Sequence, residues 1–317
     1  MTAVTCVSDG STGPASLAVA HSAMYEHWIA AAAGRRVLLV ESEDARVQEA
    51  AQRLAKLGVL PILFTRDTSF VQQGVDVHLL ADMSTDRLIE AGRLLERGAV
   101  DACVAGVATA SPAVLRAALQ TVGRASQSWL VSSLYLMLFR DGRTLGYADC
   151  VVNPRPDPAA LASIAVDSAR TFAMLTGEPA RVALLSFSTA GSARHPDVTS
   201  VQEAVRLARE RDPDILVDGE LQLDAAIVPE VAFIKAPRSA VGGRANVLIF
   251  PNLEAANIAY KITERLAGAV AAGPVLQGLD KPYFDVSRGS STDDIVRQCL
   301  LAAAMSQTDS PTSVSGA

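Results

Sequence analysis

The sequence is poor in several residue types that would point to particular classes of protein. Its 317 residues include only 5% aromatics, and 34 acidic residues outnumber 28 basic ones. The acidic balance, with an isoelectric point near 5.3, lacks the positive charge that a non-specific nucleic-acid binder needs. No apolar run approaches the roughly 20 residues of a membrane span. Residues 16–33 predict an amphipathic helix and lack the preceding basic segment of a signal peptide. We therefore expect a cytoplasmic protein whose partners include neither nucleic acid nor membrane.

Cysteine and histidine are also scarce. Cys6, Cys103, Cys150 and Cys299 are far apart and form no Cys-x-x-Cys pair, so neither a zinc site nor a disulfide framework is indicated. The four histidines form no spaced set, which argues against a histidine-ligated metal and against a Ser-His-Asp triad. These absences favour a reducing compartment and predict no bound metal.

Half of the residues are apolar, and in the first third of the chain they fall into alternating strand and helix patterns. Short apolar runs, typical of buried parallel strands, occur at 36–41, 60–64, 75–80 and 102–106. Helical spacing occurs at 44–57, 86–97 and 112–122. This alternation predicts a doubly wound α/β domain.

The pattern changes after residue 128. A long β-rich segment, 129–139, is followed by Asp141-Gly142, a strong hairpin signal, so antiparallel strands enter here. A second α/β set is expected from helices at 156–175 and 198–210, strands at 181–187 and 214–217, and the segments 224–233, 246–250 and 254–267. The final helix, 292–305, has an apolar face that needs a sheet elsewhere. The tail from residue 307 is expected to be disordered.

A polar loop, Asp-Val-Ser-Arg-Gly-Ser-Ser-Thr-Asp-Asp at 285–294, opens that final helix. A helix N-terminus presents free N–H groups, so this loop and Arg288 are suited to holding a phosphate. The spacing of Ser291 and Asp294 is also that of a capping box, in which Asp294 would be purely structural. Local pattern alone favours the cap.

Other candidate groups have equally plain alternatives. The loop Ser-Phe-Ser-Thr-Ala-Gly-Ser at 186–192 follows a strand and suits an oxyanion, but it also reads as an ordinary turn. Asp218, Glu220 and Asp224 form an acidic cluster that suits either a divalent cation or helix capping and salt bridges, and the second is favoured. Arg116 reads as a solvated charge on a helix.

Several long strings resemble the phosphate acetyltransferases (phosphotransacetylases). These strings lie at 185–192, 218–230, 235–237, 245–251, 257–261, 273–282 and 287–294. The resemblance is almost continuous from about residue 132 to 304. It is looser before that, where it is carried by residues 41–46 and by Leu115-Arg116.

The resemblance implies an acyltransferase of acetate metabolism that moves an acetyl group between acetyl phosphate and coenzyme A. Coenzyme A is then a substrate, with no further cofactor, no metal and no covalent enzyme intermediate. In the family, the aspartate matching Asp294 is proposed to take the thiol proton. The serine matching Ser287 is proposed to contact the reacting sulfur or carbonyl oxygen, and the arginine matching Arg288 to bind the phosphoryl group.

Substrate binding is assigned to further residues. By resemblance, Arg116 and Arg265 help to bind coenzyme A or acetyl phosphate. The loop 186–192 adds Ser188, Thr189, Gly191 and Ser192 as substrate-binding candidates.

The implied fold has two α/β domains, as in the isocitrate and isopropylmalate dehydrogenases, with the active site in the cleft between them. The first domain would comprise 1–126 plus 278–317, and the inserted second domain 127–277. Homodimerisation through the inserted domain is expected. One departure is that residues 65–100 are too short to hold a family helix carrying another coenzyme A-binding arginine.

Two alternatives stay open at this point. One is a phosphate acyltransferase for a longer acyl group such as butyryl. The other is a coenzyme A-binding or oligomerisation module that has lost turnover.

Overall fold

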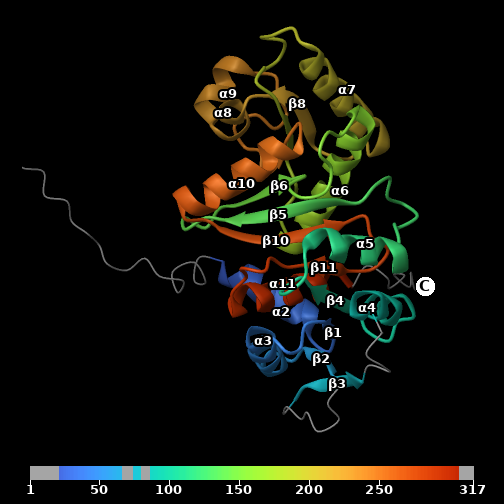
Figure 1. The fold of residues 1–317 in the computed structure, drawn as a ribbon. Coiled ribbons are helices and arrows are strands. Elements are labelled where there is room, and N and C mark those ends of the chain that lie inside the picture. Colours follow the sequence, from blue (N-terminus) through green and yellow to red (C-terminus); the bar gives the residue numbers. More distant parts are fainter. Residues whose placement is uncertain (1–20, 66–73, 80–85, 307–317) are drawn as a thin grey trace, which may run out of the picture.

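The computed structural model describes residues 21–65, 74–79 and 86–306, which fold as α/β layers around two separate sheets (Figure 1). The expected start of the first helix before residue 21 and the tail from 307 lie outside these residues. The first sheet has five strands in the order β11-β4-β1-β2-β3, all parallel. Its strands are β1 (Arg36–Leu39), β2 (Leu60–Thr65), β3 (Asp76–Leu79), β4 (Ala102–Ala105) and β11 (Tyr283–Asp285).

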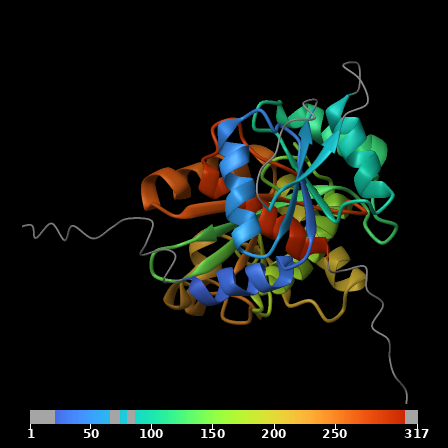
Figure 2. The ribbon, with the colours of Figure 1, turned by 90° about the horizontal axis from the view of Figure 1, so that it is seen from below.

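Helices cover both faces of this sheet, which is why its strands are almost uniformly apolar (Figures 1 and 2). One face carries α2, α3 and the final helix α11, and the other carries α4 and α5. These helices are α2 (Ser22–Ala32), α3 (Ala45–Lys56), α4 (Arg87–Glu96), α5 (Ser111–Thr121) and α11 (Thr292–Met305). The predicted helix 292–305 is confirmed, and the sheet that it was expected to need is formed by β1 and β4.

The second sheet has six strands in the order β10-β5-β6-β9-β7-β8. Strands β6, β9, β7 and β8 are parallel, whereas β5 pairs antiparallel with both β6 and β10. The strands are β5 (Ser132–Leu138), β6 (Thr144–Ala148), β7 (Val182–Leu185), β8 (Val217–Leu221), β9 (Val247–Ile249) and β10 (Val270–Gln277). The hairpin predicted at Asp141-Gly142 joins β5 to β6, and Gly142 adopts the positive φ of 86° that this turn requires.

Helices also flank this sheet on both sides. One face carries α6 (Pro158–Thr176) and α7 (Pro196–Arg211), and the other carries α8 (Leu223–Ile227) and α10 (Leu253–Ala267). The short helix α9 (Pro229–Lys235) packs on α8. None of the helices in the described ranges has the length and apolarity needed to cross a membrane.

Two sequence expectations need correction. The strand placed at 214–217 lies further along, at Val217–Leu221, because a turn closed by the Ile215 N–H on the Asp212 carbonyl follows α7. Strand β10 was not predicted, since Gly273 and Pro274 interrupt its pattern. The structure accommodates Pro274 because β10 is an edge strand whose register shifts between Ala272 and Val275.

Exposed apolar side chains occur on α9 and on α10, and together they are called the apolar stripe of α9 and α10 below. On α10, Ile258, Ile262 and Leu266 follow one another at four-residue spacing and are 58%, 51% and 83% exposed. Phe233 and Ile234 of α9 are 79% and 78% exposed. Spacing of four residues places side chains on one face of a helix, so α10 presents a continuous apolar face.

Candidate active site

The loop that joins β11 to α11 lies at the carboxyl edge of the first sheet, where α/β folds place their ligands. Ser287 and Arg288 are both exposed on it. The loop is closed by the Ser290 N–H on the Ser287 carbonyl at 2.9 Å. Arg46 of α3 donates to the carbonyls of Arg288 and Ser290 at 3.1 and 2.7 Å, so the loop is also held from outside. A fixed loop therefore presents the Arg288 guanidinium toward solvent.

Asp294 lies one turn into α11 and forms the capping box that its spacing predicted. Its Oδ2 accepts from the Ser291 N–H at 2.9 Å and from the Ser291 hydroxyl at 2.8 Å, while the Asp294 N–H donates to Ser291 Oγ. Its Oδ1 accepts from Arg297 at 2.8 Å, and Arg297 in turn donates to the Tyr25 hydroxyl. The structural role of Asp294 is thus confirmed.

These contacts also set the acidity of Asp294. Burial alone would raise its pKa, but the hydrogen bonds from Ser291 and Arg297 outweigh burial and hold the pKa below its ordinary value. The carboxylate is therefore ionised near neutral pH. Three of its roughly four acceptor sites are occupied by these donors, so a second site on Oδ1 is left for a proton from a substrate.

Two buried carboxyl groups, Glu41 and Asp285, lie at strand ends near this loop. Glu41, just beyond β1, accepts the Gly106 N–H with both carboxylate oxygens, at 2.9 and 3.1 Å. Asp285, the last residue of β11, is 5% exposed, and its Oδ1 has no hydrogen-bond partner among the described residues. Burial raises the pKa of Asp285 to about 6; the Ser111 hydroxyl opposes this rise, and the Glu41 charge adds to it. The sequence places Glu41 at the end of a predicted strand and Asp285 at the start of the polar loop, but it gives neither carboxyl group a role of its own.

The structure brings Ser287, Arg288 and Asp294 together and leaves the two other arginines apart from them. Arg116 is exposed on α5. Arg265, 79% exposed in the last turn of α10, pairs only with Glu264, at 3.4 Å. Within the described residues, neither arginine contacts the loop at 287–294. Both side chains are exposed to solvent, where a ligand can reach them.

The second candidate loop, 186–192, turns its hydroxyl groups inward. Ser188 is fully buried and donates to Glu220 at 2.9 Å, and the Gly191 N–H donates to the same oxygen at 2.8 Å. Thr189 is also buried, and its N–H donates to Ser192 Oγ at 3.0 Å. Burial would raise the pKa of Glu220, but the donors around it lower it overall. The polar groups of this loop therefore fix its own conformation on a buried carboxylate.

Each residue of the acidic cluster Asp218, Glu220 and Asp224 has its own partner. Asp218 pairs with Arg209 at 2.9 Å, and Asp224 pairs with Lys235 at 2.7 Å, whereas Glu220 is held by the loop just described. Across the described ranges, no group of three or more His, Cys, Asp or Glu side chains is arranged to hold a metal ion. The geometry is that of salt bridges and capping.

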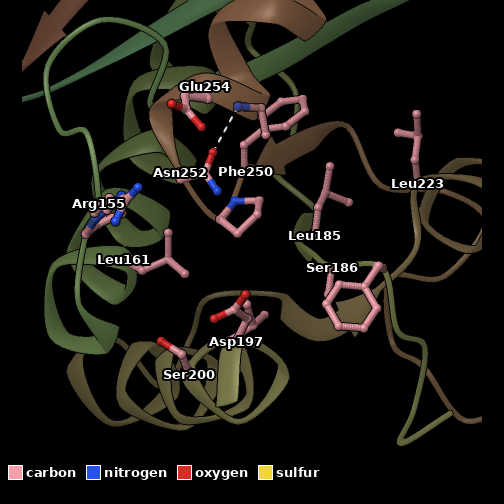
Figure 3. Close-up of a pocket in the computed structure, with 15 residues that line it drawn as sticks. Arg155, Leu161, Leu185, Ser186, Asp197, Ser200, Leu223, Phe250, Asn252 and Glu254 are labelled. Atoms are coloured by element: carbon pink, nitrogen blue, oxygen red, sulfur yellow. Dashed lines mark hydrogen bonds between the residues drawn. The ribbon is translucent and has the colours of Figure 1, made fainter. Parts of the chain in front are cut away.

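A pocket of about 730 Å³ opens at the carboxyl ends of β7 and β9 (Figure 3). These strands are neighbours, yet α7 and α10, which follow them, lie on opposite faces of the sheet, so a crevice forms between the two connections. Arg155, Glu254 and Asp197 surround one part of it, and Leu185 and Leu223 line another. Sequence reasoning identified only the strand end that borders it. The pocket lies at the N-terminal end of α10, about 20 Å along the helix from Arg265.

Comparison with known proteins identifies the class to which this fold and loop belong. The sequence model of the phosphate acetyl/butaryl transferase family matches residues 68–303, and the chain belongs to that family. A phosphate acetyltransferase of Acetivibrio thermocellus is 38% identical over 313 residues, which cover 86% of this chain and 94% of the relative. One from Paracoccus denitrificans is 39% identical over 309 residues, covering 87% and 96%.

A solved structure has the same fold as this chain. The phosphotransacetylase of Streptococcus pyogenes superposes with a TM-score of 0.83 at 34% identity, over 90% of this chain and 98% of that one. The mixed α/β fold is thus shared with a phosphotransacetylase along nearly the whole length.

Proposed function

We propose that this protein is a phosphate acetyltransferase that catalyses reversible acetyl transfer between acetyl phosphate and coenzyme A. The observation that carries the proposal is the position of Ser287, Arg288 and Asp294 on one anchored loop and helix start, at the carboxyl edge of the parallel sheet, in a member of this family. The relatives it matches are phosphate acetyltransferases, so neither the longer-acyl alternative nor the inactive-module alternative is favoured.

The proposed reaction is a direct attack in a ternary complex. The thiol of coenzyme A has an ordinary pKa of about 8.5 and needs a base to become a good nucleophile near neutral pH. Asp294 takes the thiol proton, the sulfur bonds to the acetyl carbon, and the bond from that carbon to the phosphate oxygen breaks. The proton then leaves to phosphate or to solvent. Holding both substrates in one site supplies much of the acceleration.

Arg288 and the helix supply the positive charge that this step needs. The guanidinium binds phosphoryl oxygens through two parallel N–H groups, and the first turn of α11 adds the N–H groups of a helix start. Ser287 donates its hydroxyl to the sulfur or to the carbonyl oxygen of the acetyl group. These residues stabilise the charge that develops on the leaving phosphate, so the proposed mechanism has no step for a resident metal or cofactor.

Further residues complete the substrate site in this proposal. Arg116 and Arg265 bind the phosphates of coenzyme A or acetyl phosphate, which agrees with the exposure of their side chains. The group Ser188, Thr189, Gly191 and Ser192 acts indirectly, because its hydrogen bonds fix the loop whose first residues face the pocket of Figure 3.

The substrates lie in a cleft between two domains, as in the isocitrate and isopropylmalate dehydrogenases. The first domain comprises 1–126 and 278–317, and the second comprises 127–277. Support comes from the two separate sheets, since the chain leaves the first after α5 and returns to it at β11. Buried free thiols at Cys103, Cys150 and Cys299 agree with a cytoplasmic enzyme.

The active form is a homodimer that pairs the exposed apolar stripe of α9 and α10 with its copy. A monomer rarely leaves a continuous apolar helix face in water. The stripe lies in the inserted domain and contains Leu266 at 83% exposure. Packing it against a second copy removes this face from solvent.

An assay of three acyl donors tests the proposed function. Purified protein is mixed with coenzyme A and acetyl, propionyl or butyryl phosphate, and thioester absorbance is followed. Acetyl phosphate should give the highest kcat/KM, and Arg288→Ala should abolish most of it. Arg93→Ala, an exposed arginine on α4, is the matched control that retains activity. Higher kcat/KM with butyryl phosphate, or no thioester from any donor, contradicts the proposal.

A further inference from the structure

The side chain of Arg297 joins Asp294, the proposed base, to a second helix. Arg297 lies in the second turn of α11, and its Nη1 donates to Asp294 Oδ1 at 2.8 Å. Its Nε donates to the hydroxyl of Tyr25, on α2, at 2.7 Å. Helices α2 and α11 pack against each other on one face of the first sheet (Figure 1), so the guanidinium of Arg297 bridges them.

Arg297 is buried more deeply than the arginine of an ordinary helix pair. Its side chain is 13% exposed, whereas Arg206, at the same three-residue spacing from Glu203, is 53% exposed. An exposed pair of that kind contributes little to stability. Withdrawing a guanidinium from water is costly unless charged and polar partners meet it, and Asp294 and Tyr25 are those partners. A surface salt bridge therefore does not describe Arg297.

Donors on both oxygens fix the plane of the Asp294 carboxylate. Ser291 binds only Oδ2, through its N–H at 2.9 Å and its hydroxyl at 2.8 Å. Donors on one oxygen leave a carboxylate free to pivot about that oxygen. Arg297 binds the other oxygen and blocks this pivot, so the remaining acceptor position of Oδ1 keeps one direction.

Tyr25 is itself held in place. Its ring packs on that of Trp28, with the ring centroids 5.0 Å apart. Trp28 is fully buried, and its indole N–H donates to the Leu175 carbonyl of α6 at 2.6 Å. Because a guanidinium is planar and rigid, binding its Nε to this anchored phenol also directs Nη1 toward Asp294.

We propose that Arg297, held by Tyr25, is a positioning residue that aims the open acceptor position of Asp294 Oδ1 at the thiol of coenzyme A. This role rests on the proposed function, in which Asp294 takes the thiol proton. That proton moves from sulfur to Oδ1, while Arg297 keeps its own protons and does not touch substrate. Its positive charge also favours the ionised carboxylate, which is the form that can accept a proton.

The experiment compares Arg297→Met, Arg297→Lys and Tyr25→Phe, with Arg53→Met as the matched control. Arg53 also pairs with an acidic residue in the first turn of α11, but that residue, Asp293, has no proposed role. Arg297→Met should lower kcat about 10²-fold, because misplacing a reacting group by about 1 Å has that effect. The KM for either substrate should stay within about twofold, since Arg297 makes no contact that binds them.

The milder variants should give graded losses. Arg297→Lys keeps a charged donor for Oδ1 and should lose less than about tenfold in kcat. Tyr25→Phe removes one hydroxyl and keeps the ring in place, so kcat should fall about threefold. Arg53→Met should keep kcat within about twofold. The proposal is refuted if Arg297→Met keeps the parental kcat, if its loss lies in KM alone, or if Arg53→Met loses as much.

A double-mutant cycle tests whether Arg297 acts through Asp294. In the Asp294→Asn background, Arg297→Met should change kcat less than about twofold at pH 9, where solvent ionises more of the thiol. A loss as large as in the parental enzyme would mean that Arg297 acts elsewhere, which overturns the proposal.

The same cycle on melting temperatures needs no activity. Arg297→Met should lower the melting temperature less in the Asp294→Asn background than in the parental one, because the pair is already broken there. Equal decreases would refute the pair. A wild type that forms no thioester refutes the proposed function and the positioning role with it, while the melting temperatures still decide whether Arg297 holds Asp294.

Discussion

Replacing Asp294 by asparagine separates its two roles, as cap and as base. Asparagine keeps an oxygen that can accept from the Ser291 N–H, but it loses the charge that pairs with Arg297, which is only 13% exposed. The loss of this ion pair and of the interaction with the helix dipole together lowers the free energy of unfolding by about 2 kcal/mol. For a chain of this size, that lowers the melting temperature by about 3 °C. The folded protein should therefore persist at assay temperatures.

The catalytic effect should be much larger than the structural one. Removing a general base lowers kcat by about 10²- to 10⁴-fold. With a thiol pKa near 8.5, the thiolate fraction of coenzyme A rises about 25-fold between pH 7 and pH 9, so the variant should recover by about that factor. Affinity for coenzyme A should change little, because the thiol proton contributes little to binding.

The measurement is thioester formation at pH 7, 8 and 9, together with a melting curve and a coenzyme A titration. Asp293→Asn is the matched control, since it removes a neighbouring charge from the same first turn while its partner, Arg53, lies outside the proposed site. Parental turnover of Asp294→Asn at pH 7 would refute the reasoning. Asp294 would then be a cap alone, and the base would lie elsewhere in the site.

Three further predictions follow from other parts of the molecule. Arg288→Lys should lose more than about 3 kcal/mol of transition-state stabilisation, seen as a fall of at least about 150-fold in kcat/KM, because a point charge does not replace a planar fork; near-parental turnover would contradict this. If the shortened region at 65–100 has removed a cation that binds the phosphates of coenzyme A, the KM for coenzyme A should rise with salt and with Arg265→Ala. A KM that responds to neither change would mean that other residues bind those phosphates. Burial raises the pKa of Asp167 to about 6, above its unfolded value, so its contribution to stability is present below pH 4 and is lost as the pH rises through 6. Asp167→Asn should therefore stabilise at pH 8 by about 3 kcal/mol in denaturant titration, and a variant no more stable than wild type would refute the assigned pKa.

Much of the fold could be predicted because local signals and packing agree. The helix expected at 86–97 is α4, with Asp86 as its N-cap, and the helix at 44–57 is α3, capped by Asp44. Their apolar faces, caps and terminal glycines all indicate the same boundaries. The final helix could be placed to the residue for the same reason.

The rest depends on contacts between distant residues. Strand β11 has three residues, too few to give a periodic signal, and it forms because β4 offers it a parallel edge. The loop of Ser287 and Arg288 could be singled out from its polar residues, but its anchoring by Arg46 joins residues more than 240 positions apart. That Asp285 Oδ1 is buried with no hydrogen-bond partner among the described residues is visible only once three strand ends meet.

The order in which the chain emerges from the ribosome gives the return of β11 and α11 to the first sheet a consequence for synthesis. The first four strands of that sheet are made before the second sheet, yet the face of β1 and β4 that α11 covers stays bare until the last helix has been translated. All six strands of the second sheet are translated before that helix. Until then, the nascent chain exposes the apolar face of β1 and β4. A product that ends before residue 283 also lacks Ser287, Arg288 and Asp294. The proposed catalytic residues and the helix that covers this face are thus translated together, after the strands of both sheets other than β11.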